Sequence, residues 1–346
     1  MSQAAYTITV NGTDVSNAFS PRLISLEIGD SDGGKTDTCT ITLDDAGGLI
    51  ALPQPGATIE AMLWWQDPPP GASSGAVQFS GVTDEPRAHG SRHAGRLLTI
   101  TAHSADLKGK GKQKRSKHYD QKTFGDVAKD LGQTAGYTVT VDSSLASIQR
   151  DYWVCAHESF LSWGRRIAGE LGATFKAAWP KAAFVPRNSG AATSGAALAT
   201  VAATVGVNVI AWDMAPLLSR GLYRNAKARV YDRTQAKWSS VSEGVGASGA
   251  EADHHDAFKY ADPGRATNRA TSNAADCQRQ QGSGHVEIDG DAAAQAQARL
   301  TLSGARPGID GTYTIKVARH CFSRHSGWVT TCEVEQPSGA AGTDSR

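Results

Sequence analysis

Cysteine is scarce in this sequence, and the cysteines follow no metal-binding or disulfide pattern. The five are Cys39, Cys155, Cys277, Cys321 and Cys332, with no C-x-x-C pair and one left over in any pairing. Zinc sites and redox motifs use closely spaced cysteines, and disulfide-built domains use more of them in a shorter chain. The composition therefore favours buried, reduced thiols in a reducing compartment.

An excess of charge of one sign and a strongly apolar run are also missing. The 346 residues carry a formal net charge of +1, so no overall field steers the molecule toward nucleic acid or membrane. The uncharged stretch 188–212 consists mostly of Ala, Ser, Thr and Gly, which are far less apolar than a spanning helix requires. We expect no integral membrane segment, and we interpret 191–206 as a flexible linker before a strand near Val207–Trp212.

Catalytic motifs occur only out of context. Gly71–Gly75 matches G-x-S-x-G but follows three prolines and precedes no helix, unlike a nucleophile elbow. Gly244–Gly249 matches G-x-G-x-x-G without an apolar helix after it, so a dinucleotide site is not indicated. His254-His255-Asp256 reads as a solvated polar loop, since adjacent side chains diverge in a strand or a helix. The sequence predicts no catalytic residue, no cofactor and no enzymatic activity.

Three residues near the C-terminus form a candidate metal site. A turn at His325-Ser326-Gly327 would place Cys321 and Cys332 across a hairpin from each other, where a disulfide is geometrically possible. His325 would add a third zinc ligand. Reduced cysteines on a packed hairpin are the favoured interpretation, so we predict no metal site.

The elements present indicate a mainly β chain with an α/β part in its middle. Over residues 1–105, runs of alternating apolar residues are separated by turn signals such as Asn11-Gly12, which is typical of a small barrel or sandwich. Residues 106–190 add a helix opened by Thr123 and a strand at Tyr137–Val141. The fold class is therefore α+β.

A basic segment, 108–118, joins these two parts. It holds six Lys or Arg residues among glycines but no interleaved aromatic residue, and aromatic residues are what stack bases in nucleic-acid channels. We interpret it as a solvated inter-domain loop. Any contact that it makes with DNA would be independent of the DNA sequence.

The stretch Arg150–Arg187 organises the middle part. Tyr152–Cys155 reads as a strand, and apolar residues from Phe160 to Leu171 recur at helical spacing, with Glu170 on the far side. Gly172 then suits a left-handed C-cap. Two strands joined at Pro180-Lys181 complete the stretch.

The β pattern returns over residues 207–337. A polar, alanine-containing stretch near 261–281, after Pro263, predicts a helix inserted in this second β part. We interpret residues 338–346 as a flexible tail. A short echo between Val77–Gly81 and Leu300–Gly304, each followed by a strand leading to a histidine, indicates that the two β parts are related.

Two separated signatures resemble the phage late control D family, the tail baseplate hubs of contractile-tailed phages. The first lies in Arg150–Pro186, with Cys155 and His157 where the family has glutamine and asparagine. The second lies in Leu300–Glu335, with Ala305 in place of an aromatic residue. The residues that carry the resemblance are Arg150, Trp153, Glu158, Ser159, Glu170, Gly172, Phe184, Pro186, Gly304, Pro307, Asp310, His320 and Thr331.

The resemblance implies two small tube-like β-barrel domains, 1–105 and 207–337, flanking the α/β module. It also implies a homotrimeric ring whose six similar barrels match a six-fold tail tube on one side and a three-fold spike on the other. The partners would be the spike protein, tail tube and baseplate proteins, with non-specific contact to DNA in the lumen. The location would be the virion tail baseplate, assembled in the host cytoplasm.

Two alternatives stay open. One is the hub of a phage-tail-like bacteriocin or of a type VI-like injection machine, because a shared fold does not choose among these. The other is a tail-tip cell-wall hydrolase using Glu158 and Glu170. Placed on one helix, these carboxylates would lie about 18 Å apart by helical rise, which is too far for either glycosidase geometry.

Overall fold

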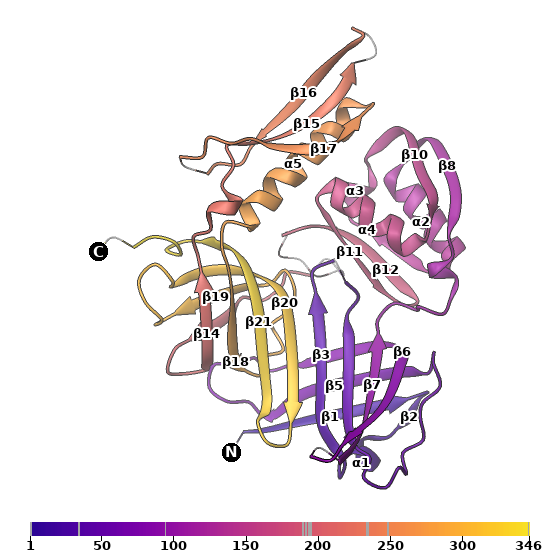
Figure 1. The fold of residues 1–346 in the computed structure, drawn as a ribbon, viewed down its shortest axis with the longest axis vertical. Coiled ribbons are helices and arrows are strands. Elements are labelled where there is room, and N and C mark those ends of the chain that lie inside the picture. The colour runs from indigo at the N-terminus through magenta and orange to yellow at the C-terminus, as the bar shows by residue number, and fades with distance from the viewer. Residues whose placement is uncertain are drawn as a thin grey trace.

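The computed structural model describes residues 2–33, 35–93, 95–188, 190, 192, 196–232, 235–247, 249–344 and 346. The chain is mainly β, with 51% of residues in strands and 16% in helices, which confirms the expected fold class. Figure 1 shows an N-terminal β unit and a C-terminal β unit side by side, an α/β module above the first, and a projecting sheet with one long helix above the second.

The N-terminal unit forms where the alternating pattern placed it. Its turn at Asn11-Gly12 has φ values of 49° and 78°, the left-handed conformation that a tight hairpin needs. The unit is not entirely β, because a one-turn helix follows β2. Its elements are β1 Gln3–Val10, β2 Thr13–Asp14, α1 Ser16–Phe19, β3 Leu23–Ser31, β4 Thr38–Asp44, β5 Thr58–Asp67, β6 Ala76–Ser91 and β7 Gly95–His103.

Local capping signals set the helices of the α/β module. Thr123 accepts from the backbone N–H of Asp126 at 3.3 Å, and Gly172 ends α4 with φ 63°. The N-cap of α4 is Ser159, so this helix begins at Phe160, three residues after His157. The elements are η1 Lys110–Lys112, β8 Arg115–Thr123, α2 Phe124–Ala135, β9 Thr138–Val141, α3 Ser143–Ala146, β10 Gln149–Glu158, α4 Phe160–Leu171, β11 Ala173–Ala178 and β12 Lys181–Pro186.

The basic segment 108–118 is not simply a loop. Its second half belongs to β8, which pairs with β10. Two of its cations make contacts within the module: Lys117 Nζ lies 2.5 Å from Asp130, and Arg115 donates to the carbonyl of Thr134 at 3.2 Å. The prediction of a loop was wrong here because charged residues on an exposed two-stranded ribbon leave no apolar alternation to recognise.

The C-terminal unit contains a larger insertion than the sequence predicted. A complete three-stranded sheet, β16-β15-β17, accompanies the expected helix α5. His254-His255-Asp256 begins β17 and is not a solvated loop, because Arg269 Nε and Asn273 Nδ2 lie 2.7 and 2.9 Å from the Asp256 carboxylate. The inserted elements are β15 Asn225–Asp232, β16 Lys237–Gly244, β17 His254–Tyr260 and α5 Pro263–Arg279.

The segments interpreted as linker and tail are partly structured. Residues 201–204 form β13, which pairs with β19, whereas residues 191 and 193–195 of the predicted linker lie outside the described residues. In the tail, Gly342 N–H donates to Gly308 at 2.8 Å and Asp344 pairs with Arg306 at 3.1 Å. The remaining elements are β13 Val201–Thr204, β14 Val209–Ala215, η2 Ser219–Gly221, β18 Ser283–Asp289, β19 Arg299–Ser303, β20 Gly311–Ser323 and β21 Gly327–Ser338.

One continuous sheet joins the two β units. Its strand order is β14-β18-β21-β20-β3-β4-β7-β6-β5-β1-β2, with β19 on β20 and β13 on β19. The crossing point is the antiparallel ladder of β3 with β20, from Ser25 opposite Ser323 to Ser31 opposite Val317. Among the described strand pairs, no ladder closes either unit into a separate barrel, because the edge of β3 pairs with the other unit.

The two units are duplicates of one topology. The strand order β3-β4-β7-β6-β5-β1 of the first is repeated as β14-β18-β21-β20-β19-β13 in the second, in the same order along the chain. The two hairpins share the sequence pattern Ser-Arg-His-x-Gly, from Ser91 to Gly95 between β6 and β7 and from Ser323 to Gly327 between β20 and β21. One difference is that β1 pairs with β5 antiparallel, whereas β13 pairs with β19 parallel.

A shared β-bulge confirms this equivalence. In β3 the register shifts between Leu23 and Ser25, and in β14 it shifts between Val209 and Ala211. The extra residues are Ile24 and Ile210, exposed by 42% and 52%. The echo between Val77–Gly81 and Leu300–Gly304 supports a relation but matches the wrong strands, since it equates β6 with β19 whereas the topology equates β6 with β20.

His320 lies in the core of the C-terminal unit and is fixed as a neutral imidazole. Its Nε2–H donates to the carbonyl of Ala294 at 3.0 Å, and its Nδ1 accepts from the Thr330 hydroxyl at 2.9 Å. Burial lowers the pKa of His320 to about 4, against smaller opposing effects of Asp30 and Asp291. The folded chain therefore resists protonating a side chain that the unfolded chain protonates below about pH 6.5.

We predict that this histidine makes the protein less stable in acid. Its contribution is present above pH 6.5 and is lost as the pH falls toward 4, by up to roughly 3 kcal/mol of unfolding free energy. Urea denaturation of the wild type and of His320→Gln across this range measures it. The difference between the two proteins should change over this window, and a constant difference contradicts the assignment.

Candidate assembly interface

The shared sheet has one apolar face and one polar face. Residues that pair directly across strands point to the same side, so the register fixes the composition of each face. One row runs from Glu85 through Thr101, Thr40, Glu27, Cys321 and Val329 to Asp289, crossing both units without a break. The other side holds the cores, with Leu26, Ile41 and Ile100 in the first unit and Val286, Ala318 and Cys332 in the second.

Carboxylates outnumber basic groups on the polar face. Arg87 pairs with Glu85 at 2.8 Å, and Arg319 pairs with Glu333 at 2.6 Å. Glu27, Glu287 and Asp289 add further negative charge on the same side of the sheet. The face is thus hydrated, continuous and acidic.

Each β unit leaves part of one strand edge unpaired among the described ladders. On the first unit, β6 beyond residue 83 pairs with β7 alone among the described ladders. On the second unit, β14 pairs with β18 and, within the same residues, makes one further bridge, from Val209 to Val205. Apolar side chains gather at this second edge and in the turn before it, namely Val205, Val207, Ile210 and Trp212, exposed by 37% to 55%. Such edges invite pairing with another chain.

The sequence analysis assigned no functional role to either edge, although it predicted a strand near Val207–Trp212 that overlaps β14. The signal that would have found the first is the repeated Ser-Arg-His-x-Gly turn, which assigns β6 the position that β20 holds in the other unit. The second edge carries no comparable motif, because Val209–Ala215 becomes equivalent to β3 only through its bulge.

Most residues of the first signature stabilise the α/β module. Glu170, predicted on a flank or the far side of its helix, is buried between Arg150 at 2.8 Å and Arg265 at 3.0 Å. Burial alone would raise the pKa of Glu170, but hydrogen bonds from Arg265 and the charge of Arg150 hold it below its ordinary value. The Arg150 guanidinium also stacks 4.1 Å from the Trp153 ring.

The same contacts bear on the hydrolase alternative. Glu158 ends β10 and is held by Arg166 at 2.6 Å, and Glu170 faces the inserted helix α5 through Arg265. The two carboxylates belong to separate ion pairs. The remaining residues of the signature are structural: Ser159 caps α4, Gly172 ends it, Phe184 packs in the module core and Pro186 pairs with Ala173.

Residues of the second signature form a tight turn and the sheet beyond it. Asp310 accepts from the backbone N–H groups of Ala305 and Arg306 at 2.8 and 3.2 Å. Gly304 has φ 79°, which favours glycine, and Pro307 lies within the turn. His320 is buried as described above, and Thr331 lies on the polar face opposite Arg319.

Cys321 and Cys332 do not face each other. Cys321 lies opposite Val329 and Cys332 opposite Ala318, because the turn fixes Ser323 opposite Gly327. Positions 318 and 321 are an odd number of residues apart, so the two thiols point to opposite faces of the sheet. Both are free, and His325 lies in the exposed turn. Within the described part of the chain, no group of three His, Cys, Asp or Glu side chains is placed to hold a metal.

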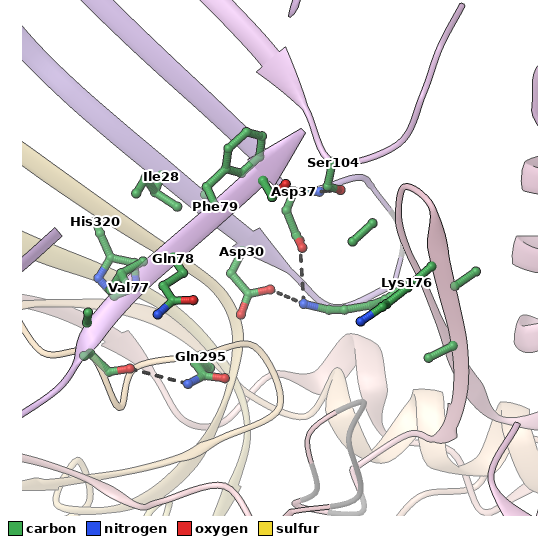
Figure 2. Close-up of a pocket in the computed structure, with 18 of the residues that line it drawn as sticks. Ile28, Asp30, Asp37, Val77, Gln78, Phe79, Ser104, Lys176, Gln295 and His320 are labelled. Carbon is green, nitrogen blue, oxygen red and sulfur yellow. Dashed lines mark hydrogen bonds and ion pairs between the residues drawn. The ribbon is translucent and has the colours of Figure 1, made fainter. Parts of the chain in front are cut away.

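A cavity of about 670 Å³ lies where the two β units and the module meet. Figure 2 shows Asp30, Asp37 and Lys176 on one side of it, with Gln78, Gln295 and His320 on the other. Lys176 Nζ pairs with Asp30 and lies 3.6 Å from Asp37, and Asp30 also accepts from the N–H of Ala296 at 2.8 Å. Burial raises the pKa of Asp37 to about 6, against the opposing charge of Lys176. The charged groups tie three parts of the chain together.

The two remaining motif matches, G-x-S-x-G and G-x-G-x-x-G, do not mark a catalytic or nucleotide-binding site among the described residues. Ser73 of the G-x-S-x-G match donates to Asp291, tying the proline loop to the C-terminal unit. The G-x-G-x-x-G match includes residue 248, which lies outside the described residues. Among the described helices, none combines the length and hydropathy needed to cross a bilayer.

Comparison with known proteins shows the family. The family model described as phage tail baseplate hub (GPD) matches residues 38–326. The probable baseplate hub protein of Escherichia phage 186 is 31% identical over 191 residues, which cover 55% of this chain and 47% of that protein. The chain thus spans about half the length of this curated relative.

Solved structures share the fold at low identity. The tail protein from Neisseria meningitidis MC58 superimposes with a TM-score of 0.68 at 13% identity, covering 96% of both chains. The E. coli c3393 protein, a component of the type VI secretion system, superimposes with a TM-score of 0.54 at 11% identity, covering 94% of this chain and 76% of that one. With the family model matching most of its length, the chain belongs to the phage tail baseplate hub (GPD) family.

Proposed function

We propose that three copies of this chain form the ring-shaped hub of a tail baseplate. The observation that carries the proposal is the duplicated β unit in one continuous sheet. Three chains would supply six similar units, which suits a six-fold tube on one side of the ring and a three-fold spike on the other. Closing the ring also covers the edges of β6 and β14, which a free chain leaves exposed.

The partners follow from this position in the tail. The hub would bind the spike protein, the tail tube and baseplate proteins, and it would reside in the virion baseplate after assembly in the host cytoplasm. The name of the phage 186 relative supports a phage tail. The fold shared with a type VI secretion component supports the alternative of a related injection machine, and neighbouring capsid and terminase genes would decide for a phage.

The polar face of the shared sheet suits the lining of a conduit for DNA. The opposite face is buried in the two cores, so only this face is available to water along the whole sheet. Its excess of carboxylates repels phosphate, so DNA would pass without adhering. The basic segment 108–118 lies on the module rather than on this sheet.

We expect the purified protein to be a trimer. Multi-angle light scattering should give three times the 36.3 kDa chain mass. A protein that remains a monomer at high concentration contradicts the ring.

We further expect the polar face of the shared sheet to bind DNA only weakly because of its negative charge. Glu27→Lys with Glu287→Lys should bind short duplex DNA roughly tenfold more tightly than wild type at low salt, and added salt should abolish the gain. The matched control is Glu243→Lys with Glu251→Lys, which makes the same change on the projecting part of the chain. Fluorescence anisotropy measures binding, and an equal gain in the control contradicts a role of this face.

The proposal also assigns the chain no chemistry of its own. Purified protein should release no products from peptidoglycan. Lytic activity that is lost on substitution of Glu158 or Glu170 by glutamine, with the trimer intact, would favour the hydrolase alternative instead.

A further inference from the structure

The β3–β20 ladder, which joins the two β units inside the chain, indicates how the units of two neighbouring copies can pair. In the β3–β20 ladder, Cys321 lies opposite Glu27, Phe322 opposite Leu26, and Arg319 opposite Gly29. Both strands have an equivalent in the other unit. If neighbouring units in the ring always meet in the same way, the ladder between copies repeats this pairing on the equivalent strands.

The repeated turn assigns the equivalents of β20. Ser323 and Gly327 pair across one turn, and Ser91 and Gly95 pair across the other. Counting back from these turns, His89 of β6 takes the place of Cys321, and Arg87 takes the place of Arg319. The partner strands agree, because Arg87 lies opposite Thr99 and Arg319 opposite Thr331.

The shared bulge assigns the equivalents of β3. Ser25 and Ala211 each follow the extra residue of their strand. Counting forward from the bulge, Trp212 takes the place of Leu26, Asp213 that of Glu27, and Ala215 that of Gly29.

We propose that β6 of one copy pairs antiparallel with β14 of the next copy in a defined register. His89 lies opposite Asp213 of the next copy, Gly90 opposite its Trp212, and Arg87 opposite its Ala215. The proposal rests on the trimeric ring proposed above and adds the strands and the register that close it. A second copy of this chain is the occupant because the same chain already contains this ladder.

The side chains at the two edges are complementary in this register. Trp212 is 37% exposed in the single chain and meets a glycine, so its ring has room to pack over Gly90 and the core beneath β6. Inside the chain the larger side chain is on the other strand: Phe322 of β20 takes the position of Gly90, and it lies opposite Leu26 of β3, which takes the position of Trp212. His89 and Asp213 form a hydrogen-bonding pair on the polar face.

Two prolines end the ladder at the same level. Pro86 takes the place of Ala318, and Pro216 takes the place of Asp30, which faces Ala318 inside the chain. Proline has no backbone N–H to donate. The ladder between copies therefore pairs β6 from residue 87 onward in one copy with residues 211–215 of the next. A shift of the register by two residues would place a proline inside this ladder.

Cysteine cross-linking tests the register. In a Cys321→Ser background, His89→Cys with Asp213→Cys should form covalent dimers and trimers under mild oxidation and stop at three chains. The matched control, His89→Cys with Ala211→Cys, keeps both cysteines on the polar face but shifts the register by two residues. It should cross-link at least about tenfold more slowly, since opposed Cβ atoms lie about 5 Å apart and diagonal ones about 7 Å or more.

The outcomes separate this inference from the trimer itself. A trimer by light scattering that cross-links only through the control pair, or through neither pair, overturns the register and leaves the ring. A protein that is monomeric and forms no cross-link overturns both proposals.

A charge exchange tests the same contact without oxidation. His89→Asp places two carboxylates opposite each other and should raise the concentration at which the trimer half-dissociates by about fivefold. His89→Asp with Asp213→His restores the pair and should return that concentration to the wild-type value. If the exchange does not rescue, these two residues are not opposite each other.

Discussion

The antiparallel ladder of β3 with β20 is the interaction on which the whole molecule depends. It turns two copies of a β unit into one sheet, and it fixes the angle at which they meet. Aromatic contacts seal it on the core side: Tyr6 lies 5.1 Å from Phe322 and Trp65 lies 5.4 Å from Trp328, between ring centroids. Trp65 Nε1 also donates to Gly290 at 2.7 Å. A junction built this way is rigid, because it combines ladder hydrogen bonds with closely packed rings.

Buried charges hold the α/β module against this double unit. Glu170 connects Arg150 of the module to Arg265 of the insertion, and Asp30 connects Lys176 of the module to Ala296 of the C-terminal unit. Ion pairs of this kind add little net stability, because burying the charges costs about as much as pairing them returns. Their geometry is specific, however, and removal of one partner leaves an uncompensated buried charge. Such pairs therefore fix the orientation of the α/β module relative to the two β units that it contacts.

The features that sequence predicted correctly are those set by neighbours along the chain. Thr123 begins one helix and Gly172 ends another through bonds within a few residues, so their residue types sufficed. Glu170 was misplaced because its burial depends on Arg265, ninety-five residues away. The expectation that a turn at 325–327 would place Cys321 opposite Cys332 was wrong, because a three-residue change in register moves a side chain to the other face of a sheet. The repeated units were recognised in kind but aligned to the wrong strands, because strands of similar composition match in several registers and only the turn sequence distinguishes them.

The β3–β20 ladder inside the chain differs from the β6–β14 ladder proposed between copies in a way that suits a protein that folds before it assembles. Inside the chain, Phe322 and Leu26 face each other beside the aromatic cluster, so the contact forms with folding and buries apolar surface permanently. The edges left over combine the polar residues His89 and Asp213 with apolar residues of β14 such as Ile210 and Trp212, which are exposed in the single chain. In the ring proposed above, covalent fusion of two units would halve the number of contacts that form by association, from six to three, and each association costs translational and rotational freedom. A junction between chains that mixes polar and apolar residues would then be sufficient, because half of the contacts of the proposed ring would form when the chain folds.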